Sequence, residues 1–298
     1  MALTRKQFEL LEVLATAQGA FTQRGLEKTT GHSLGTINRV MRELAELGYV
    51  EDGGITPGGF DALEPYRAKR AIFIAAGFGT RLVPITFNTP KPLVRVHGVC
   101  IIDRLIDACL EAGIDEIYIV RGYLAELFDQ LLYKYPMIKF LENPVYNEAN
   151  NISSSLVARY MLSNAYVFEA DLLIYNPKII RKYHYTSDFL AIRKERSDDW
   201  CFRVKDGIIR EEKVGGEGDD IWQMVGISYW NEADGHKLSQ DIQEVYQSPG
   251  GKERYWEQVP LVYRKERYAV EVRECREEDI VEIDTFNELK AIDRTYDV

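Results

Sequence analysis

Apolar residues in the first part of the chain recur at helical spacing. One such segment spans residues 3–15, and a shorter one spans residues 22–28. In a third segment, after Ser33, one face carries Leu34, Ile37, Val40, Met41, Leu44 and Leu47. A serine at this position can accept hydrogen bonds from the free N–H groups of the first turn, and Gly48 is suited to end the helix. The pattern predicts three helices.

Residues 49–56 depart from this spacing. Their sequence, YVEDGGIT, predicts two short strands around an Asp-Gly-Gly turn, and residues 56–67 predict a final short helix. Three helices and a hairpin in this order resemble a winged helix-turn-helix domain of the kind found in bacterial transcription regulators. We therefore expect such a domain over residues 1–66.

After residue 70, strand-like and helix-like segments alternate. Strands are predicted at 71–77, 115–122 and 138–144, helices at 101–113 and 124–135, and the end of a helix followed by another strand at 160–174. Alternation of this kind predicts an α/β domain with a doubly wound, mostly parallel, Rossmann-like sheet, in which ligands bind beyond the carboxyl ends of the strands. We expect this second domain to cover residues 70–298.

Charge and composition narrow the class of protein. The net charge is -10, and residues 1–70 carry nine basic and nine acidic residues, so the acidic excess lies in the second domain. This balance argues against a protein that mainly holds nucleic acid by its phosphates. No apolar run approaches the roughly 20 residues that span a bilayer, so we expect no membrane contact and a cytoplasmic location. The four scattered cysteines predict free thiols.

A glycine-rich loop follows the first strand of the α/β domain. Its sequence is AAGFGTRL, residues 75–82, and PKPL follows at residues 90–93. Alanine and glycine let the backbone N–H groups approach phosphate oxygens closely, and Arg81 and Lys91 add the positive charges that a triphosphate requires. A glycine loop alone can simply connect a strand to a helix, but the arginine and the PKPL segment favour phosphate binding.

The stretch AAGFGTRLVPITFNTPKPLVRV resembles the signature of the nucleotidyltransferase family, which includes sugar-phosphate nucleotidylyltransferases and bacterial CTP:phosphocholine cytidylyltransferases. The resemblance implies that the loop wraps the phosphates of an NTP, that Arg81 stabilises the leaving pyrophosphate, and that Lys91 contacts phosphate near the reacting centre. The loop residues implied are Ala75, Ala76, Gly77, Phe78, Gly79 and Thr80.

Three acidic residues are candidates for a metal site. Asp171 follows an apolar strand, and Glu282 and Asp284 lie two apart on a predicted strand, so that they share a face. Carboxylates placed together repel one another unless a cation lies between them. Asp171 and Asp284 can alternatively cap a turn or a helix. The segments EADLL and EID resemble those of phosphocholine cytidylyltransferases, and this resemblance implies that all three residues bind Mg²⁺.

Aromatic residues are candidates for binding the acceptor. A quaternary ammonium group donates no hydrogen bonds, so its recognition takes aromatic faces, often with a carboxylate nearby. Trp200, Tyr229 and Trp256 are the candidates, and filling of the core is the alternative for each. Local matches across residues 70–292 resemble phosphocholine cytidylyltransferases. Ala170 before Asp171, where sugar-nucleotide enzymes normally carry glycine, favours that branch of the family.

A polar segment precedes a predicted helix after the strand at 138–144. Asn150, Asn151 and Ser154 lie where they can bind the base or ribose of a nucleotide, or simply cap the helix. Both interpretations remain open from the sequence.

The resemblance implies transfer of CMP from CTP to phosphocholine with Mg²⁺, which gives CDP-choline and pyrophosphate. Phosphoethanolamine or a sugar 1-phosphate are alternative acceptors. A different class of function is a DNA-binding regulator, in which Thr36, Asn38, Arg39 and Arg42 contact DNA and the α/β domain senses a metabolite. A protein–protein role for residues 1–66, as in a homo-oligomer, is a further alternative.

Overall fold

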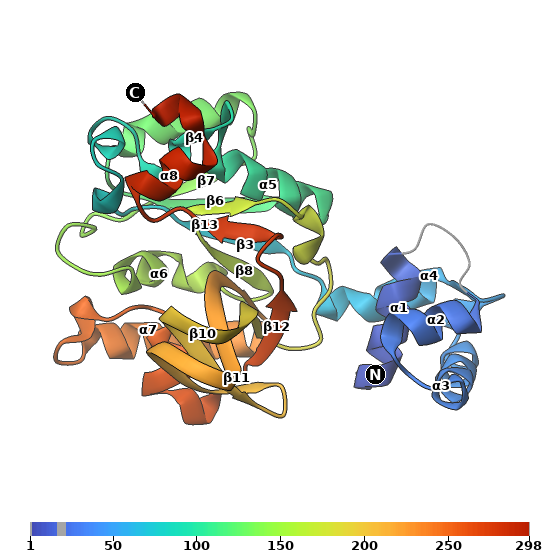
Figure 1. Ribbon diagram of the computed structural model, residues 1–298. Helices are drawn as coiled ribbons and strands as arrows, with labels where there is room; N and C mark the ends of the chain where they lie inside the picture. The colour runs from blue at the N-terminus through green and yellow to red at the C-terminus, as the bar shows by residue number, and fades with distance from the viewer. Residues whose placement is uncertain (1, 17–21, 298) are drawn as a thin grey trace. The chain divides into compact units, whose positions relative to one another are not determined.

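The computed structural model describes residues 2–16 and 22–297, which form two compact units (Figure 1). The first unit contains the described residues up to Arg67, together with Tyr183–Tyr185. The second contains Ala68–Lys182 and the described residues from Thr186 onward.

The first unit is a small helical domain with a hairpin. Its elements are α1 (Arg5–Thr16), α2 (Gln23–Thr30), α3 (Leu34–Glu46), β1 (Val50–Glu51), β2 (Gly54–Ile55), α4 (Pro57–Leu63) and the 3-10 turn η1 (Glu64–Tyr66). The hydroxyl of Ser33 accepts the N–H of Thr36, as expected of the cap of α3. The helices and the hairpin that the apolar pattern predicts are all present.

The core of this unit gathers the apolar faces of its helices. Ile37, Val40 and Leu44 of α3 are buried, but Leu34 and Leu47 are 37% and 42% exposed. The predicted apolar face is therefore too long, because these two residues lie at the ends of α3, beyond the part of the helix that packs. The segment Tyr183–Tyr185 completes the core, where the ring of Tyr185 stacks on Tyr66.

The second unit is built on a seven-stranded sheet. Its strands are β3 (Arg70–Ile74), β6 (Glu116–Arg121), β7 (Lys139–Glu142), β8 (Ala165–Glu169), β10 (Asp188–Lys205), β11 (Ile208–Trp230) and β12 (Glu271–Cys275). They follow the order β10-β12-β11-β8-β3-β6-β7. Strands β7, β6, β3 and β8 are parallel, and β11 runs antiparallel to β8. This arrangement confirms the predicted mostly parallel α/β sheet.

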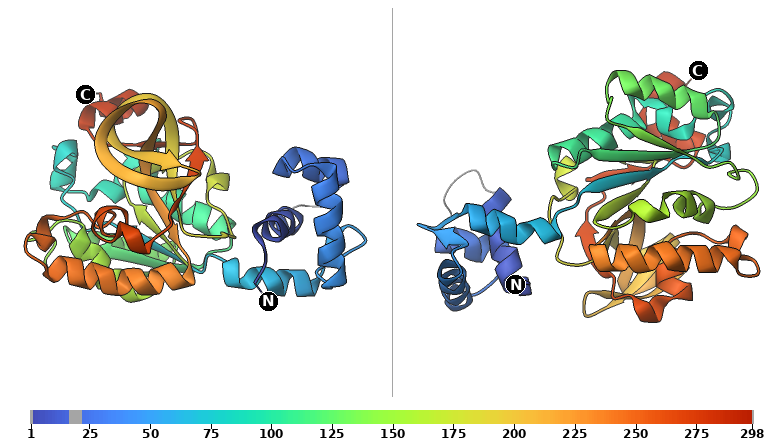
Figure 2. Two further views of the ribbon diagram at one scale, coloured as in Figure 1. Left: turned by 90° about the horizontal axis from the view of Figure 1, so that it is seen from below. Right: turned by 180° about the vertical axis from the view of Figure 1, so that it is seen from behind.

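Alternating residues on each central strand face two separate cores. In β3, Phe73 packs on one side and Ile72 on the other. Helix α5 (Ile101–Glu111) covers the first face, and α6 (Ile152–Ala158) and α7 (Glu232–Gln247) cover the second (Figures 1 and 2). Because both faces are covered, the strands are nearly continuous apolar runs.

Short elements lie beside the main sheet. The two-stranded pairs are β4 (Arg95–Val96) with β5 (Val99–Cys100), and β9 (Leu172–Ile174) with β13 (Ile280–Glu282). Helix α8 spans Phe286–Ile292, and short turns are η2 (Thr80–Leu82), η3 (Ile85–Phe87), η4 (Lys91–Leu93), η6 (Arg159–Met161), η7 (Pro177–Ile179), η8 (Gly251–Glu253), η9 (Val259–Tyr263), η10 (Lys265–Arg267) and η11 (Arg294–Tyr296).

Two features differ from the sequence expectation. The helix predicted at 124–135 is a 3-10 helix, η5 (Ala125–Tyr133), because it starts from left-handed Leu124 and its apolar positions suit i+3 as well as i+4 contacts. The long β10–β11 hairpin is not evident from the pattern.

All four cysteines are free and buried. Among the helices that the structure describes, none is long and apolar enough to cross a membrane.

Candidate active site

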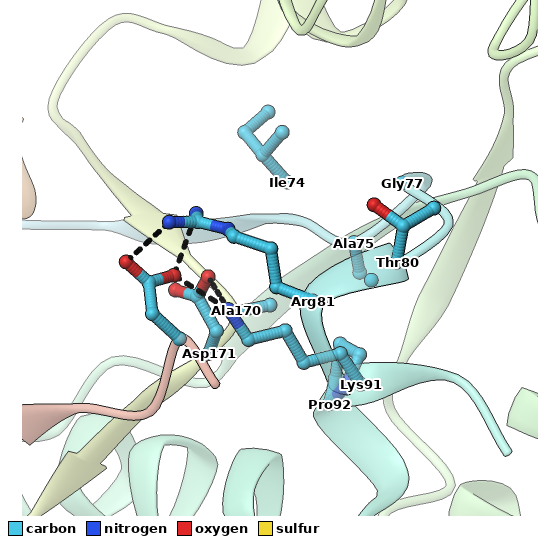
Figure 3. A pocket seen from close by; sticks show the side chains of 11 residues that line it. Ile74, Ala75, Gly77, Thr80, Arg81, Lys91, Pro92, Ala170 and Asp171 are labelled. Carbon is cyan, nitrogen blue, oxygen red and sulfur yellow. Dashed lines mark hydrogen bonds and ion pairs between the residues drawn. The ribbon is translucent and has the colours of Figure 1, made fainter. Parts of the chain in front are cut away.

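The glycine-rich loop and two of the predicted acidic residues, Asp171 and Asp284, line one cavity (Figure 3). The ammonium of Lys91 lies 2.7 Å from Asp171 Oδ2 and 3.1 Å from Asp284 Oδ1. The two terminal nitrogens of Arg81 each lie 2.7 Å from an oxygen of the Asp284 carboxylate. Residues from distant parts of the sequence therefore line one cavity of about 260 Å³.

A small apolar core holds these polar groups together. It contains Leu82, Val94, Val96, Ile101, Leu173, Ile283 and Leu289. Leu82 follows Arg81 directly, and Ile283 lies between Glu282 and Asp284. The pairing of β9 with β13 sets Glu282 opposite Leu172, and Ile283 donates its N–H to the carbonyl of Asp171 at 3.2 Å. Burial of the apolar neighbours thus fixes the charged side chains.

The loop leaves its backbone open toward the cavity. Gly79 has φ +62°, and a Cβ there would lie 3.0 Å from Cβ of Lys91, so the close approach requires glycine. The N–H groups of residues 77–79 bond to no other described residue, which suits anion binding. Of the predicted loop residues, Ala75, Gly77, Gly79 and Thr80 line the cavity.

Ala76 and Phe78 point elsewhere than the sequence suggests. Ala76 is buried, and its carbonyl accepts the N–H of Tyr123. The ring of Phe78 packs on Tyr123 and Tyr146, with centroids 5.1 and 5.3 Å away. Neither residue lines this cavity, so the prediction is corrected for both.

Three carboxylates are close enough to share a cation. Single oxygens of Glu169, Asp171 and Glu282 all lie within 4.8 Å of one another. Oδ1 of Asp171 is buried and has no hydrogen-bond partner among the described residues. Mg²⁺ binds carboxylate oxygens at about 2.0–2.1 Å, so this donor set fits the ion that we predict. Glu169 was not foreseen, although it precedes Asp171 by the same two-residue spacing that links Glu282 and Asp284.

Asp284 differs from its predicted environment. It lies beyond β13, which ends at Glu282, and its oxygens face Arg81 and Lys91. Burial by itself would raise the pKa of Asp284, but the positive charge of Lys91 outweighs this effect, so that the pKa is lowered. The alternative of a helix cap is wrong, because Thr285 caps α8. The structure therefore pairs Asp284 with two cationic side chains and places Glu169, instead of Asp284, in the group of carboxylates that could share a cation.

Charge in this cluster is unbalanced. Burial, with the charge of Asp171, raises the pKa of both Glu169 and Glu282. Burial lowers the pKa of Lys91, but Asp171 and Asp284 outweigh it and the net pKa is raised. Lys91 therefore stays charged, and a further cation would offset the repulsion among the clustered carboxylates.

Gly226 makes room for Glu169 and yields a prediction. It has φ +52°, and a Cβ would lie 3.0 Å from Oε2 of Glu169. We expect Gly226→Ala to displace this carboxylate and to raise the Mg²⁺ concentration for half-maximal activity about tenfold. Gly207→Ala is the matched control, because Gly207 has φ +76° with nothing within 4 Å. It should cost about 1–2 kcal/mol of stability and leave Mg²⁺ dependence unchanged; equal Mg²⁺ dependence in both variants would contradict the assignment.

A second cavity, of about 470 Å³, adjoins the first. Asp171 and Glu282, which belong to the group of carboxylates that could share a cation, also line this second cavity. Its wall further contains Trp200, Tyr255 and Glu257. The two rings meet edge to face with centroids 5.5 Å apart. Glu257 is only 3% exposed. We refer to this space as the acceptor cavity.

Two of the three predicted acceptor aromatics lie in the core instead. Tyr229 is fully buried, and its hydroxyl bonds to Asn164 Oδ1 at 3.2 Å. Trp256 is 3% exposed and stacks on Phe189. Neither lines the acceptor cavity, so core filling, the alternative for these residues, corrects the expectation. Trp200 lines the acceptor cavity, and so does Tyr255, the neighbour of Trp256.

The polar segment before α6 supports the acceptor cavity. Asn150 Nδ2 donates to the carbonyl of Glu253 at 3.2 Å, and Asn151 Oδ1 accepts the N–H of Trp256 at 2.9 Å. Ser154 is buried and accepts from Asn143 Nδ2 at 3.0 Å. Asn151 lines the acceptor cavity, whereas Asn150 and Ser154 line neither cavity, and the side chain of Asn151 makes no capping bond to α6.

Glu212 yields a prediction about stability. Burial, and then the charge of Glu257, raises its pKa to about 8. Between pH 5 and 8 the folded state holds a proton that the unfolded state has lost, so stability falls as pH rises through this range. We expect Glu212→Gln to remove about 1–2 kcal/mol of the loss between pH 5.5 and 7.5, measured by urea unfolding. Glu211→Gln, at an exposed position, is the control; identical pH slopes in all three proteins would contradict the burial of an ionisable Glu212.

Comparisons with known proteins identify the families that the two parts of the chain resemble. Residues 70–187 match the Nucleotidyl transferase family, and residues 3–54 match the MarR family. The chain is 34% identical to the 2-aminoethylphosphonate cytidylyltransferase of Lancefieldella rimae over 76% of this chain and 92% of that protein. It is 31% identical to the choline-phosphate cytidylyltransferase of Streptococcus pneumoniae over 75% of this chain and 96% of that protein.

A solved structure supports the same assignment. The crystal structure of the CTP:phosphocholine cytidylyltransferase from Streptococcus pneumoniae superposes with a TM-score of 0.70 at 30% identity, covering 77% of this chain and 99% of that one. The chain therefore belongs to the nucleotidyl transferase family and carries a MarR-type helical domain before the α/β unit.

Proposed function

We propose that the protein transfers CMP from CTP to a small acceptor that carries a phosphate or phosphonate at one end and a cationic nitrogen at the other. The observation that carries this proposal is that two sites are continuous. The carboxylates that could share a cation also line the acceptor cavity, whose wall contains Trp200, Tyr255 and Glu257. Both named relatives act, by their names, on acceptors of this kind.

The reaction is an in-line displacement at phosphorus. An oxygen of the acceptor phosphate or phosphonate forms a bond to the α-phosphorus, the bond to the bridging oxygen breaks, and pyrophosphate leaves with the bonding electron pair. The acceptor oxygen is already ionised near neutral pH, so no strong general base is required. Glu169, Asp171 and Glu282 would hold Mg²⁺, which supplies charge neutralisation and alignment of the phosphate oxygens.

The chain's own cations have separate tasks. Lys91 is 8% exposed and held between Asp171 and Asp284, so it presents a fixed charge at the reacting phosphate. Arg81 has a side chain that is 65% exposed, and its partner Asp284 lines the same cavity. The guanidinium can exchange this carboxylate for a phosphate of the NTP with little movement, which suits stabilisation of pyrophosphate as it leaves. The free N–H groups of the loop add further donors.

Two acceptors fit this description. Phosphocholine, which the sequence favours, and 2-aminoethylphosphonate both place a cationic nitrogen two carbons from the acidic end. The aromatic pair Trp200 and Tyr255 can contact either nitrogen group by cation–π attraction. A sugar 1-phosphate has no cation to place beside the buried Glu257, so we do not propose it as the acceptor.

An activity panel tests this function. The full chain is incubated with Mg²⁺, with CTP, UTP, ATP or GTP, and with 2-aminoethylphosphonate, phosphocholine, phosphoethanolamine or glucose 1-phosphate, and pyrophosphate release is followed. We expect release with CTP and the cationic acceptors. Absence of release with every cationic acceptor, or faster release with glucose 1-phosphate, would contradict the proposal.

For the helical unit we propose DNA binding, on the basis of its match to the MarR family. Asn38, Arg39 and Arg42 of α3 are exposed, but the arginines pair with Glu43 and Glu46 at four-residue spacing. These pairs reduce the positive charge that meets the DNA phosphates, so we expect weak binding with a shallow dependence on salt. A gel shift with DNA from upstream of its own gene is the test, and no shift at low salt would contradict this role.

A further inference from the structure

Two carboxyl groups, of which one lines the acceptor cavity, have no cationic partner. Glu257 lines the cavity, and its hydrogen bond from Asn151 Nδ2 is 3.5 Å long, at the limit for such a bond. Both carboxyl oxygens of Glu212 are buried and accept no hydrogen bond. Within residues 2–16 and 22–297, no lysine, arginine or histidine forms an ion pair with either glutamate. The wall of the cavity therefore carries uncompensated acidity.

The fold brings the two carboxyls to the same core. Glu212 of β11 pairs directly with Phe202 of β10, so the two side chains share a face of the hairpin. Phe202 contacts Phe189, with ring centroids 5.5 Å apart, and Phe189 stacks on Trp256 at 6.1 Å. These packed rings join the hairpin that carries Glu212 to the segment that carries Glu257 through one core, and the side chain of Glu257 turns from this core toward the cavity. The negative charge of Glu257 adds to the burial that raises the pKa of Glu212, as expected for neighbours.

A buried carboxyl pair is stable when it is protonated or when a cation with N–H donors enters. Burial raises the pKa of Glu257 to about 7, so the free site is partly protonated at neutral pH. A primary ammonium group offers three N–H donors and satisfies carboxylate oxygens directly. A trimethylammonium group offers none, and its methyl groups would leave the oxygens desolvated and unpaired.

We propose that Glu257, with Glu212 as its neighbour, forms a recess for a primary ammonium group, so that the preferred acceptor is an aminoalkyl phosphate or phosphonate instead of a quaternary ammonium compound. This inference rests on the proposed function and narrows its acceptor. Trp200 and Tyr255 flank the alkyl chain, and Glu257 receives the ammonium. Glu212 acts as a positioning residue without contact to the reacting atoms, since an ammonium group bound at Glu257 favours the ionised form of this neighbouring carboxyl and is attracted by it in turn.

The test compares phosphoethanolamine with phosphocholine, which differ only in the methyl groups on nitrogen. The kcat/KM for each acceptor is measured at saturating CTP and Mg²⁺ for the wild type, Glu257→Gln, Glu212→Gln and the exposed control Glu211→Gln. We expect the wild type and the control to prefer the primary amine about 100-fold. Both cavity variants should reduce this ratio about tenfold or more, chiefly through KM for phosphoethanolamine, while Glu212→Gln keeps its kcat.

The outcomes separate this inference from the proposed function. A wild type that releases pyrophosphate but prefers phosphocholine, or a preference that is the same in Glu212→Gln and Glu211→Gln, would overturn the ammonium recess and leave CMP transfer standing. No release with any acceptor would overturn the proposed function itself. Because Glu212→Gln removes a buried ionisable group without changing its shape, loss of folding does not confound the comparison.

Discussion

Replacing Asp171 by asparagine is expected to lower kcat/KM for pyrophosphate release by roughly 10³-fold. Asp171 takes part in both halves of the site, because one oxygen accepts from Lys91 at 2.7 Å and the other is buried without a partner. The amide keeps the shape of the side chain but loses the charge that holds a cation and orients the lysine. The kcat/KM for CTP, measured at saturating acceptor over a range of Mg²⁺, gives the effect.

Asp279→Asn is the control for this variant. Asp279 accepts hydrogen bonds from Asn176 and Arg276 close to β13, outside both cavities. It should retain activity within about threefold, since it touches neither cavity. Full turnover in Asp171→Asn would contradict the catalytic account.

Replacing Lys91 by methionine is expected to reduce kcat by about 10²–10³-fold and also to destabilise the fold. The ammonium lies between Asp171 and Asp284, whose side chains are 20% and 22% exposed, so its removal leaves two partly buried carboxylates unpaired. We expect a loss of about 2–4 kcal/mol in EDTA, with part of it recovered in Mg²⁺, because the ion can replace the missing charge. Urea unfolding in the two buffers measures this difference.

Lys178→Met serves as the control, because Lys178 is exposed and its side chain has no ion pair in the described part of the chain. Its stability should be the same in EDTA and in Mg²⁺ apart from the shift seen in the wild type. If Lys91→Met showed no greater recovery in Mg²⁺ than this control, the lysine and the ion would not share one carboxylate cluster.

The loop and the mostly parallel sheet could be predicted because their signals are local. The loop is recognised from one short segment, because its small residues and the positive φ of Gly79 belong to the same few positions. The apolar strands that end before residues 75 and 171 place these two residues at the same edge of the sheet. The meeting of Asp171 with Glu282 was expected only from family resemblance. It depends physically on the β9–β13 pairing, which joins segments more than a hundred residues apart.

The remaining site residues could not be predicted, because their assignment depends on which side of the backbone each side chain faces. In the segment Tyr255–Glu257, the tyrosine and the glutamate line the acceptor cavity and the tryptophan between them enters the core. A sequence cannot assign these sides in an irregular segment without the contacts that fix it, here the bonds from Asn150 and Asn151. Glu169 was missed for a related reason, since the space for its side chain comes from Gly226 on another strand.

Binding of Mn²⁺, as a paramagnetic substitute for Mg²⁺, tests the central claim most directly. The affinity of the full chain in the presence of CTP is measured by electron paramagnetic resonance for the wild type, Glu169→Gln, Glu282→Gln and the exposed control Glu148→Gln. The account predicts one tightly bound ion in the wild type and control, and affinity reduced by about tenfold or more in the two cluster variants. Equal affinity in all four proteins would contradict a metal site built from these carboxylates.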